Sequence, residues 1–543
     1  MPRKKRELWV IDCETDPFKA GRDNPLPFLW GAYRPADSFY QTFGFASLVV
    51  DFFASRPALV YAHNGGRFDF HYLREGFESE SPVVVINGRI AKFHIGACEF
   101  RDSFSILPVP LSAYQKEEID YGIFEPGERE KPENAARIEA YLKSDCVNLA
   151  SLITQFFARF GRPFTQAGCA MSYYVKNYRN GIRPRQTAVQ FETYKPFYYG
   201  GRVECFTSGW RELNFSVVDK NSAYPDAMMR EHPSTPSAAQ VSTLPSDIER
   251  CLVSLNAVSR GAFPWRAPDG SLIFPRDREA RDYQVTGWEL KKGLELKLVT
   301  IRKIHAVHRF YETESFKAYI EHFYAERRRA QELGDKAGDL FNKLLMNSCY
   351  GKFASDPSKY HDFVIVAPDR LAAWIGEGWQ QYHPWGDGRW LMYRPQPVEK
   401  HWYYNVATAA SITGYVRAQF LQDLETASDL IYCDTDSIAA RGVLSLPIGQ
   451  QLGEWKMELE CDAYAVAGKK MYAFRSANDL YKLKRGEYKV ASKGVDLTAD
   501  EIIRVARGER IEYRPTVPTY SLMRAQPVLI NRVVARTAKV QHV

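Results

Sequence analysis

Two carboxylates, Asp434 and Asp436, follow an apolar run that begins at Leu430. Residues two apart on a strand share one face, so these carboxylates should project together. Their like charges repel unless a cation lies between them, and a divalent metal is the usual cation. A second apolar run, residues 215–218, ends in Asp219 and supplies a third carboxylate. Three acids at strand ends suit two-metal phosphoryl transfer, with ions about 3.5–4 Å apart. Alone, the Asp434 pair would more often be a turn with solvated acids.

A second group of acids lies near the N-terminus. Asp12 and Glu14 follow the apolar residues 8–11 and are again two apart, as on one face of a strand. Further along, Tyr141 and Asp145 are four residues apart, so on a helix the phenol and the carboxylate can face the same water molecule. Each pattern alone is more often a chance match or a surface pair. Together they form an independent acidic constellation in the first third of the chain.

One predicted helix carries a polar stripe. Lys343, Asn347 and Tyr350 are spaced i, i+4 and i+7, which places them on one face of a helix. From there Lys343 can reach a triphosphate, while Asn347 and Tyr350 lie over the base. A further helical run contains Arg327 and Arg328. A basic helical run is more often a solvated face, and the choice between these two arginines stays open.

The elements that position these groups require several domains. The chain has 543 residues, which suits two to four domains with separate cores. Its 45% hydrophobic and 25% charged residues are ordinary for a globular protein, and no window approaches the roughly 18 apolar residues of a membrane span. The net charge of +7 is compatible with a phosphate backbone as partner. Nine cysteines without a Cys-x-x-Cys pair indicate reduced thiols and argue against a zinc site.

Three segments resemble, in order, motifs A, B and C of the family-B DNA polymerases. They are Asp219 with the following Tyr224 and Pro225, residues 343–351, and residues 432–437. Three matches in the right order make chance an unlikely explanation. The resemblance implies a nucleotidyl-transfer site that uses two Mg²⁺ or Mn²⁺ ions.

The same resemblance assigns roles to single residues. Asp219 and Asp436 would bind the metals, with Asp434 as the supporting acid. Tyr224 matches the steric gate, an aromatic ring packed where a ribose 2′-hydroxyl would lie, so the substrate would be a deoxynucleotide. Arg327 would be a second phosphate contact beside Lys343.

The N-terminal acids resemble, in order, the three motifs of the proofreading 3′–5′ exonucleases. In that family four carboxylates hold two metals, and the Tyr that corresponds to Tyr141 helps to orient the attacking water. His63 and Asn64, in the middle motif, would contact the primer end. The four implied ligands are Asp12, Glu14, Asp69 and Asp145.

The resemblance implies an α/β and α+β multidomain fold, with an RNase H-like exonuclease followed by a right-hand polymerase of palm, fingers and thumb. The gaps after Pro225 and after Gly351 exceed what a minimal palm and fingers require. The protein-primed branch of family B has two insertions there, one that docks the terminal protein and one that helps to encircle DNA. We expect the exonuclease at 1–165 and the polymerase at 166–543, with the palm at about 190–235 and 403–475, the first insertion at about 236–312, the fingers at about 313–355, the second insertion at about 356–402 and the thumb at about 476–543.

Further strings, among them residues 61–66, 100–103 and 467–472, are similar to the replicative polymerases of tectiviruses, the tailless phages with an internal membrane. The similarity extends from about residue 8 to residue 497, and the last 40 or so residues match nothing. It implies further DNA contacts from residues that would otherwise be ordinary turn or strand residues: Ser103, Tyr198, Gly200, Gly201, Lys470, Tyr472 and Lys493.

We therefore expect a DNA-directed DNA polymerase with 3′–5′ proofreading that replicates a linear viral genome and starts on a hydroxyl of a terminal protein. The expected partners are template and primer DNA, dNTPs and the terminal protein, without a membrane and without a stable homo-oligomer. We expect no signal peptide, and the host cytoplasm as location. Two alternatives stay open: a DNA-primed or primer-independent repair polymerase, and a catalytically inactive DNA-binding protein, against which the intact acids argue.

Overall fold

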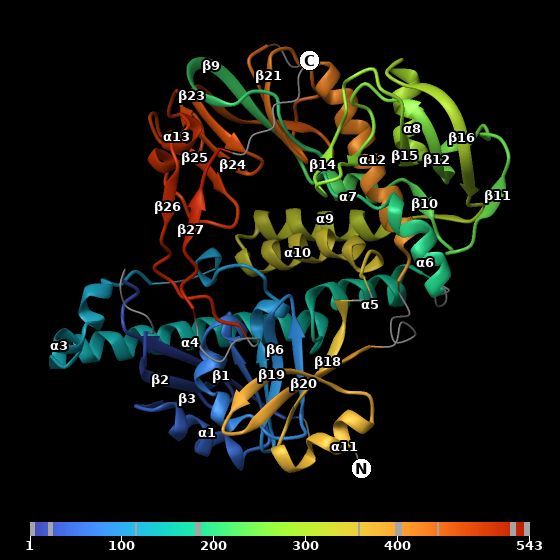
Figure 1. Cartoon of the computed structure of the whole chain (residues 1–543). Helices are drawn as coiled ribbons and strands as arrows, with labels where there is room; N and C mark the ends of the chain where they lie inside the picture. Colours follow the sequence, from blue (N-terminus) through green and yellow to red (C-terminus); the bar gives the residue numbers. More distant parts are fainter. Residues whose placement is uncertain are drawn as a thin grey trace.

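The computed structural model describes residues 6–19, 25–114, 117–179, 186–356, 359–396, 404–442, 445–521 and 528–536. An N-terminal module built on a large sheet lies below a C-terminal module (Figure 1). Between them lie helices α5 (Gln166–Tyr178), α9 (Lys317–Glu332) and α10 (Lys336–Phe353). Over the described residues, we find no helix with the length and hydropathy needed to span a membrane. All nine cysteines are buried free thiols.

A ten-stranded sheet forms the centre of the N-terminal module. β4 pairs in parallel with β1 and with β7, and all five of its residues are buried, as expected for a strand covered on both faces. In sheet order the strands are β19 (Gln380–Gly386), β20 (Arg389–Pro395), β18 (His361–Val366), β5 (Pro82–Ile86), β6 (Arg89–Ile95), β7 (Cys98–Asp102), β4 (Ala58–Ala62), β1 (Glu7–Thr15), β2 (Pro27–Arg34) and β3 (Phe39–Phe43).

Three strands of this sheet come from a distant part of the chain. β18, β19 and β20 fall within the second insertion expected at about 356–402, and β18 joins the sheet by pairing with β5, where Phe363 lies opposite Val83. The helix between these strands is α11 (Leu371–Gly376). The predicted division into domains stays a prediction. It did not include the pairing of β18 with β5. Alternating apolar residues indicate a strand but do not identify the strand with which it pairs.

The long helix of the N-terminal module is α4 (Pro132–Phe160). Its buried residues include Ile138, Leu142, Leu149 and Phe156, which recur at helical spacing and pack on the sheet. Proline at the first position suits a helix start, where its missing N–H has no partner to lose. The shorter helices of this module are α1 (Ala46–Ala54), α2 (Asp69–Tyr72) and α3 (Pro126–Arg129).

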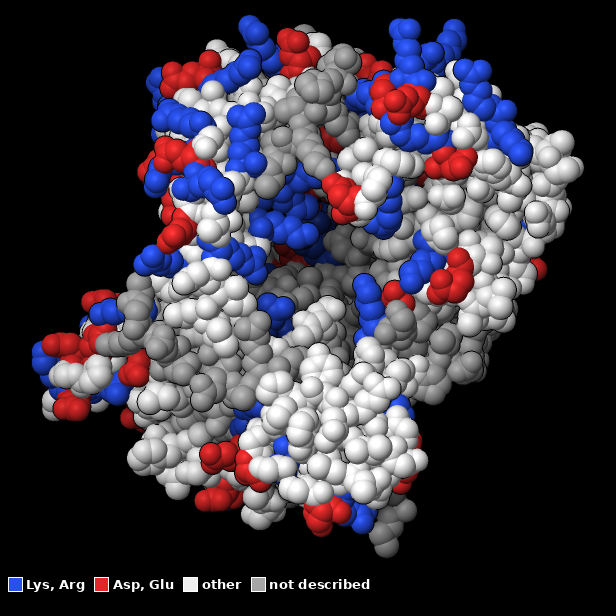
Figure 2. All heavy atoms as spheres, in the orientation of Figure 1, with Lys and Arg blue, Asp and Glu red and all other residues white. Residues whose placement is uncertain are grey.

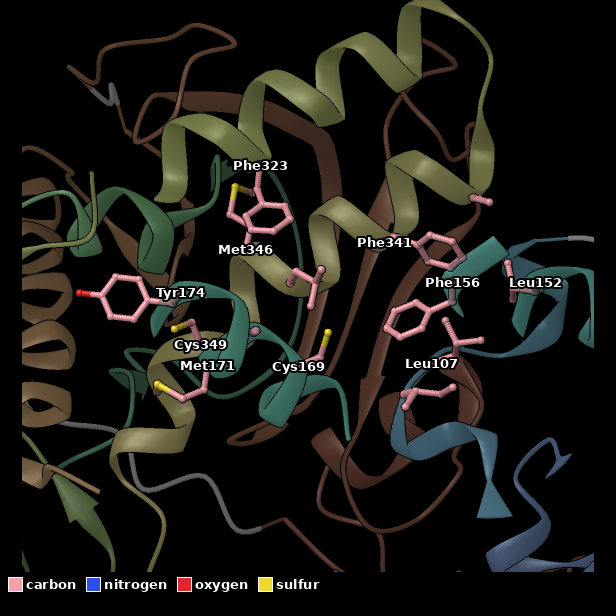
Figure 3. Packing of buried hydrophobic residues seen from close by; sticks show 14 of the residues in the cluster. Leu107, Leu152, Phe156, Cys169, Met171, Tyr174, Phe323, Phe341, Met346 and Cys349 are labelled. Carbon is pink, nitrogen blue, oxygen red and sulfur yellow. The ribbon is translucent and has the colours of Figure 1, made fainter. Parts of the chain in front are cut away.

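One hydrophobic core joins the two modules. Phe156 of α4 meets Phe341 of α10 edge to face, with ring centroids 5.1 Å apart. Figure 3 shows this cluster, in which Phe323 of α9 and Met346 of α10 continue the packing. Such aromatic pairs contribute about 0.5–1.5 kcal/mol beyond their area burial. Residues on α4 and on α10 are therefore held by one shared core.

A seven-stranded sheet forms the centre of the C-terminal module. α12 (Val406–Glu425) packs on it through Phe420 and Leu424 and is buried on nearly all sides, with 16 buried residues. In sheet order the strands are β25 (Tyr488–Ser492), β24 (Met471–Ser476), β23 (Trp455–Gly468), β9 (Gly209–Lys220), β22 (Ser437–Ala440), β21 (Leu430–Asp434) and β8 (Val203–Cys205).

A separate four-stranded sheet lies at the far edge of this module, inside the first expected insertion. Its strands, in sheet order, are β11 (Ala239–Val241), β16 (Thr300–Arg309), β12 (Cys251–Val258) and β15 (Arg281–Thr286). The remaining elements are α6 (Ala188–Tyr194), α7 (Ala223–Met228), α8 (Gly287–Glu295) and α13 (Ala499–Ala506), with the strand pairs β10 (Glu231–Pro233) and β17 (Thr313–Ser315), β13 (Trp265–Arg266) and β14 (Leu272–Ile273), and β26 (Ile511–Tyr513) and β27 (Arg532–Val534).

Candidate active sites

Three carboxylates of the C-terminal module meet on neighbouring strands. Asp219 lies at the end of β9, Asp434 ends β21, and Asp436 lies in the turn before β22. The Lys220 N–H donates to the Asp436 carbonyl at 2.7 Å, which ties β9 to this turn. We expected Asp434 and Asp436 to share the face of one strand. The strand instead ends at Asp434, and the turn at Thr435, with φ +61°, brings the two acids together.

Two lysines contact these carboxylates. Lys470 Nζ lies 2.6 Å from Asp434 Oδ2, and Lys456 Nζ lies 3.0 Å from Asp219 Oδ1. Burial, with the negative charges of Asp219 and Asp434, raises the pKa of Asp436 to about 6. The site therefore combines mutually repelling acids, which favour a divalent metal, with two lysines that would compete with that metal for the carboxylates.

A cavity of about 620 Å³ opens beside Asp219 and Asp436. Lys343 and Asn347 of α10 line it, as the helical stripe predicted, and the Asn347 amide donates to the Lys343 carbonyl at 2.8 Å. Arg327 and Arg328 of the basic run in α9 both line it as well, so the choice between them stays open. Arg327 Nε is fixed by Asp339 Oδ1 at 2.7 Å. The cavity thus presents several cations to a polyanionic ligand.

Two aromatic rings lie next to this cavity. Tyr224 of α7 and Tyr350 of α10 stack face to face, with centroids 4.6 Å apart and planes 8° from parallel. Burial raises the pKa of Tyr224 to about 12, and the charge of nearby Asp436 adds to the effect. Two phenols predicted from separate motifs therefore form one rigid wall close to the carboxylates.

The second acid group lies in a cavity of about 880 Å³ in the N-terminal module. β1 carries Asp12 and Glu14, α2 begins with Asp69, and Tyr141 and Asp145 face the cavity from α4. Glu14, Asp69 and Asp145 are buried. The structure thus gathers all five predicted residues at one place.

The loop after β4 adds polar side chains to this cavity. His63 and Asn64 both line it, and Asn64 adopts φ +61° and accepts a hydrogen bond from Arg89 Nη1 at 2.6 Å. Gly66 makes the tight turn possible, because a Cβ there would lie 2.1 Å from the carbonyl oxygen of Ile90. The Gly-Gly pair therefore lets the loop approach β6 closely.

Ser103 does not line the cavity. It is fully buried, its hydroxyl lies 3.0 Å from His63 Nδ1, and it donates to the Ala62 carbonyl at 3.2 Å. The direct DNA contact that we predicted for Ser103 does not fit this burial. The contacts are instead those of a side chain that orients His63.

The comparisons with known proteins agree with this geometry. Residues 110–373 match the model of the family described as DNA polymerase type B, organellar and viral. The DNA-directed DNA polymerase of Enterobacteria phage PRD1 is 35% identical over 521 residues, which cover 92% of this chain and 89% of the phage protein. The chain belongs to the family-B DNA polymerases. The resemblance to the protein-primed branch that the motifs indicated is thereby confirmed.

Solved structures confirm the fold class. The orthorhombic crystal form of Phi29 DNA polymerase superposes with a TM-score of 0.75 at 18% identity, covering 98% of this chain and 100% of that one. Phi29 DNA polymerase in complex with primer-template DNA and incoming nucleotide substrates gives a TM-score of 0.73 at 17% identity over the same shares. The polymerase thus has the predicted arrangement of an exonuclease fold followed by palm, fingers and thumb.

The other predicted DNA contacts lie in the C-terminal module. Lys470, in the hairpin between β23 and β24, bonds Asp434, and the Lys493 N–H donates to the Lys470 carbonyl at 2.9 Å. The ring of Tyr472 packs on Phe474 at 4.3 Å. Gly200 and Gly201 lie in the loop before β8, with Tyr198 partly buried beside them. Figure 2 shows a hollow in this face with Lys and Arg side chains around it.

The acids of the polymerase fit a divalent metal. Asp69 Oδ1 is buried without a hydrogen-bond partner, a costly state that a cation relieves. Asp219 and Asp436 supply the hard oxygen donors that Mg²⁺ prefers. In the described part of the chain, no three His, Cys, Asp or Glu side chains are close enough to complete a metal site.

Two site residues were missed by the sequence analysis. Tyr520 reaches the N-terminal cavity from the C-terminal part of the chain, where its hydroxyl lies 2.7 Å from that of Tyr72 and its ring lies 5.2 Å from that of Phe68. Lys456 is brought to Asp219 by the pairing of β23 with β9. A single Tyr or Lys outside a motif carries no signal of its own, and strand register is not readable from one sequence.

Proposed function

We propose that this family-B DNA polymerase replicates a linear viral genome by protein-primed initiation and proofreads with a 3′–5′ exonuclease. The observation that carries the proposal is the meeting of Asp219, Asp434 and Asp436 beside a cavity lined by Lys343 and Arg327. A second acid cavity in the N-terminal module supports the exonuclease.

For synthesis, Asp219 and Asp436 would hold two Mg²⁺ or Mn²⁺ ions, which would neutralise the charge of the triphosphate. The attacking hydroxyl oxygen bonds to the α-phosphorus, the bond to the β-phosphate oxygen breaks, and pyrophosphate leaves in line. Lys343 and Arg327 bind the leaving phosphates as cations. The stacked ring of Tyr224 excludes a ribose 2′-hydroxyl, so deoxynucleotides are preferred.

For proofreading, Asp12, Glu14, Asp69 and Asp145 would hold two further ions. His63 and Asn64 bind the 3′ end of the strand, and Tyr141 orients the water that attacks the terminal phosphodiester. The Tyr141 hydroxyl lies 3.2 Å from that of Tyr121, which limits its rotation. A positioned phenol of this kind orients a nucleophile without losing its own proton.

The two insertions support priming by a protein. The sheet of β11, β16, β12 and β15 is the expected docking surface of a terminal protein, and β18–β20 form the second insertion. The first nucleotide would be joined to a serine, threonine or tyrosine hydroxyl of that protein. We propose that the polymerase works in the host cytoplasm as a monomer that pairs one to one with the terminal protein. Template and primer DNA would bind at the palm, where they would contact Lys470, Tyr472 and Lys493.

The test is incorporation of labelled dNTP with Mg²⁺ on a linear template that carries the genome-end sequence. The reaction contains the candidate terminal protein and no DNA primer, and Asp436→Ala is run in parallel. Label at the mass of the terminal protein, absent with Asp436→Ala, supports protein priming. Label only after a DNA primer is added favours the DNA-primed repair polymerase instead. Near-normal extension by Asp436→Ala would reject the assigned metal site.

A further inference from the structure

The loop of residues 198–202 presses directly on the turn that carries the catalytic acids. The Thr435 N–H donates to the Arg202 carbonyl at 2.7 Å. A Cβ added at Gly201 would lie 2.4 Å from Thr435 Oγ1 and 2.9 Å from its Cβ, closer than real Cβ contacts. A Cβ at the neighbouring Gly200 would meet nothing within 4 Å. The second glycine of this loop is therefore required by its contact with Thr435.

One buried arginine holds the loop in place. Arg417 of α12 donates from Nη1 to the Tyr199 carbonyl at 2.6 Å and to the Gly200 carbonyl at 2.9 Å. Its Nε donates to Glu289 Oε1 at 2.7 Å, and the side chains of Arg417 and Glu289 are 2% and 1% exposed. Bonds made by a buried guanidinium allow little adjustment, because a displaced partner leaves a charge without compensation.

Glu289 connects this arrangement to the first insertion. It lies in α8, where its Oε2 accepts hydrogen bonds from the Thr286 hydroxyl at 2.8 Å and from the Thr286 N–H at 3.0 Å. The same threonine touches α12, since a Cβ at Gly414 would lie 2.1 Å from Thr286 Oγ1. α8 and α12 therefore pack closely side by side (Figure 1).

Stability alone does not explain this pair of charges. A buried ion pair contributes little net stability compared with apolar side chains of similar volume. Arg417 instead combines one ion pair with two hydrogen bonds to a loop that touches the Asp434 turn. This arrangement specifies where the loop lies, whatever it adds to folding.

We infer that Arg417 is a positioning residue of the polymerase site, and that Glu289 of the first insertion orients it. Arg417 holds the loop in the position in which Gly201 contacts Thr435. This contact fixes Asp434 and Asp436 relative to Asp219. The first insertion is thereby a structural support of the catalytic acids. The inference rests on the proposed metal binding by Asp219 and Asp436, so Asp436→Ala serves as the reference in each experiment.

The first experiment measures single-turnover primer extension by Arg417→Lys and Glu289→Gln at saturating DNA. Misplaced acids should lower the maximal rate about 10-fold to 100-fold. The Kd for dNTP should stay within about twofold, because the cations that line the nucleotide cavity are unchanged, and the Mg²⁺ concentration for half-maximal rate should rise. A wild-type rate and Mg²⁺ requirement in both variants would overturn the inference. If Asp436→Ala is inactive in the same assay, the proposed function stands regardless.

The second experiment separates positioning from stability. The double variant Arg417→Met/Glu289→Leu replaces both buried charges with apolar side chains, which should raise its unfolding temperature above that of either Arg417→Met or Glu289→Leu. Its extension rate should nevertheless stay low, because nothing then binds the two loop carbonyls. Recovery of the wild-type rate in the double variant would show a purely structural role and would overturn the inference.

The third experiment tests the contact with Thr435. Gly201→Ala should lower the maximal rate more than Gly200→Ala, which adds the same methyl group in open space. Adding Thr435→Gly to Gly201→Ala removes the atoms that the methyl group meets, and glycine accepts the φ of +61° at this position. The pair should therefore regain part of the rate. Equal rates for Gly201→Ala and Gly200→Ala would contradict the proposed contact.

Discussion

The two acid sites of this polymerase have opposite surroundings. Aromatic rings line the N-terminal cavity, among them Phe68, Phe124 and Tyr520, and three of the four acids proposed as metal ligands there are buried. Lysines and arginines line the cavity beside Asp219 and Asp436, and Asp219 and the neighbouring Asp434 each contact a lysine. The two sites differ in this way although one hydrophobic core packs α4 of the N-terminal module against α10.

This difference follows the ligand that each cavity suits. Bases of a single strand stack on aromatic rings, at about 1–3 kcal/mol per base, without regard to sequence. A triphosphate instead requires cations and rigid donors. The same carboxylate chemistry can therefore serve two reactions, because the residues around the acids select the substrate.

The largest expected effect separates the two sites completely. Asp436→Ala removes a proposed metal ligand of the palm and should lower primer extension by about 10³-fold or more, since metal ions stabilise the transition state by several kcal/mol. Digestion of single-stranded DNA by the same variant should stay near the wild-type rate. Asp12→Ala should give the reverse pattern. Loss of both activities in either variant would mean that the sites are not independent.

The next effect tests the aromatic wall of the N-terminal cavity. Tyr520→Ala should lower the rate of digestion of single-stranded DNA by about 5-fold to 100-fold, the range that corresponds to one stacking partner. Tyr520→Phe keeps the ring and loses only the hydrogen bond to Tyr72 Oη, so it should retain most of the activity. The measurement is the initial rate of nucleotide release, with primer extension as the control. Equal losses in both variants would assign the effect to the hydroxyl.

A smaller effect tests the cations of the palm. Lys456 competes with a metal for Asp219, and its side chain is 52% exposed, so this ion pair is weak, at about 0.2–1 kcal/mol. Lys456→Gln should therefore lower the Mg²⁺ concentration for half-maximal extension by about 1.4-fold to 5-fold. A Mg²⁺ titration of the extension rate measures this. A higher Mg²⁺ requirement would instead show that Lys456 binds the triphosphate.

The sequence predicted the residues of both sites better than their surroundings. The spacing of Tyr141 and Asp145 alone predicted that they share one face of a helix, and both line the same cavity. It did not predict that Ser103 is buried or that β18 extends the N-terminal sheet. These features depend on strand pairing between residues far apart in the chain, and pairing is decided by packing rather than by local pattern.

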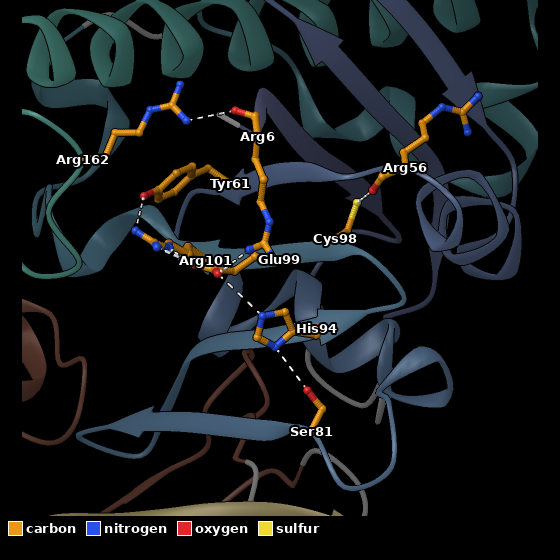
Figure 4. A network of polar contacts seen from close by, with 9 residues as sticks. All are labelled: Arg6, Arg56, Tyr61, Ser81, His94, Cys98, Glu99, Arg101 and Arg162. Atoms are coloured by element: carbon orange, nitrogen blue, oxygen red, sulfur yellow. Dashed lines mark hydrogen bonds and ion pairs between the residues drawn. The ribbon is translucent and has the colours of Figure 1, made fainter. Parts of the chain in front are cut away.

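The last expected effect concerns the stability of the N-terminal module, not activity. Glu99 of β7 accepts hydrogen bonds from Arg6 Nη1 at 2.6 Å and from Arg101 Nε at 2.5 Å, and His94 lies beside it (Figure 4). His94 and Arg101 hold the pKa of the Glu99 carboxyl well below its usual range. Bonds to such a charged group contribute about 1.5–3 kcal/mol in total where they are buried. Glu99→Gln should therefore lower the unfolding temperature at pH 7.

The stabilisation that Glu99 contributes depends on pH in a predictable direction. Because folding lowers the pKa of Glu99, its contribution is complete above the unfolded pKa of about 4.3 and is lost as the pH falls below that value. Glu99→Gln should consequently differ most from the wild type near pH 7 and least near pH 3, as followed by thermal unfolding. Glu7→Gln, whose carboxylate pairs with Arg34 at the surface, is the matched control and should change little at either pH. A difference that grows on acidification would contradict the assigned charge. Primer extension at low temperature should be unaffected, because Glu99 belongs to the sheet of the other module.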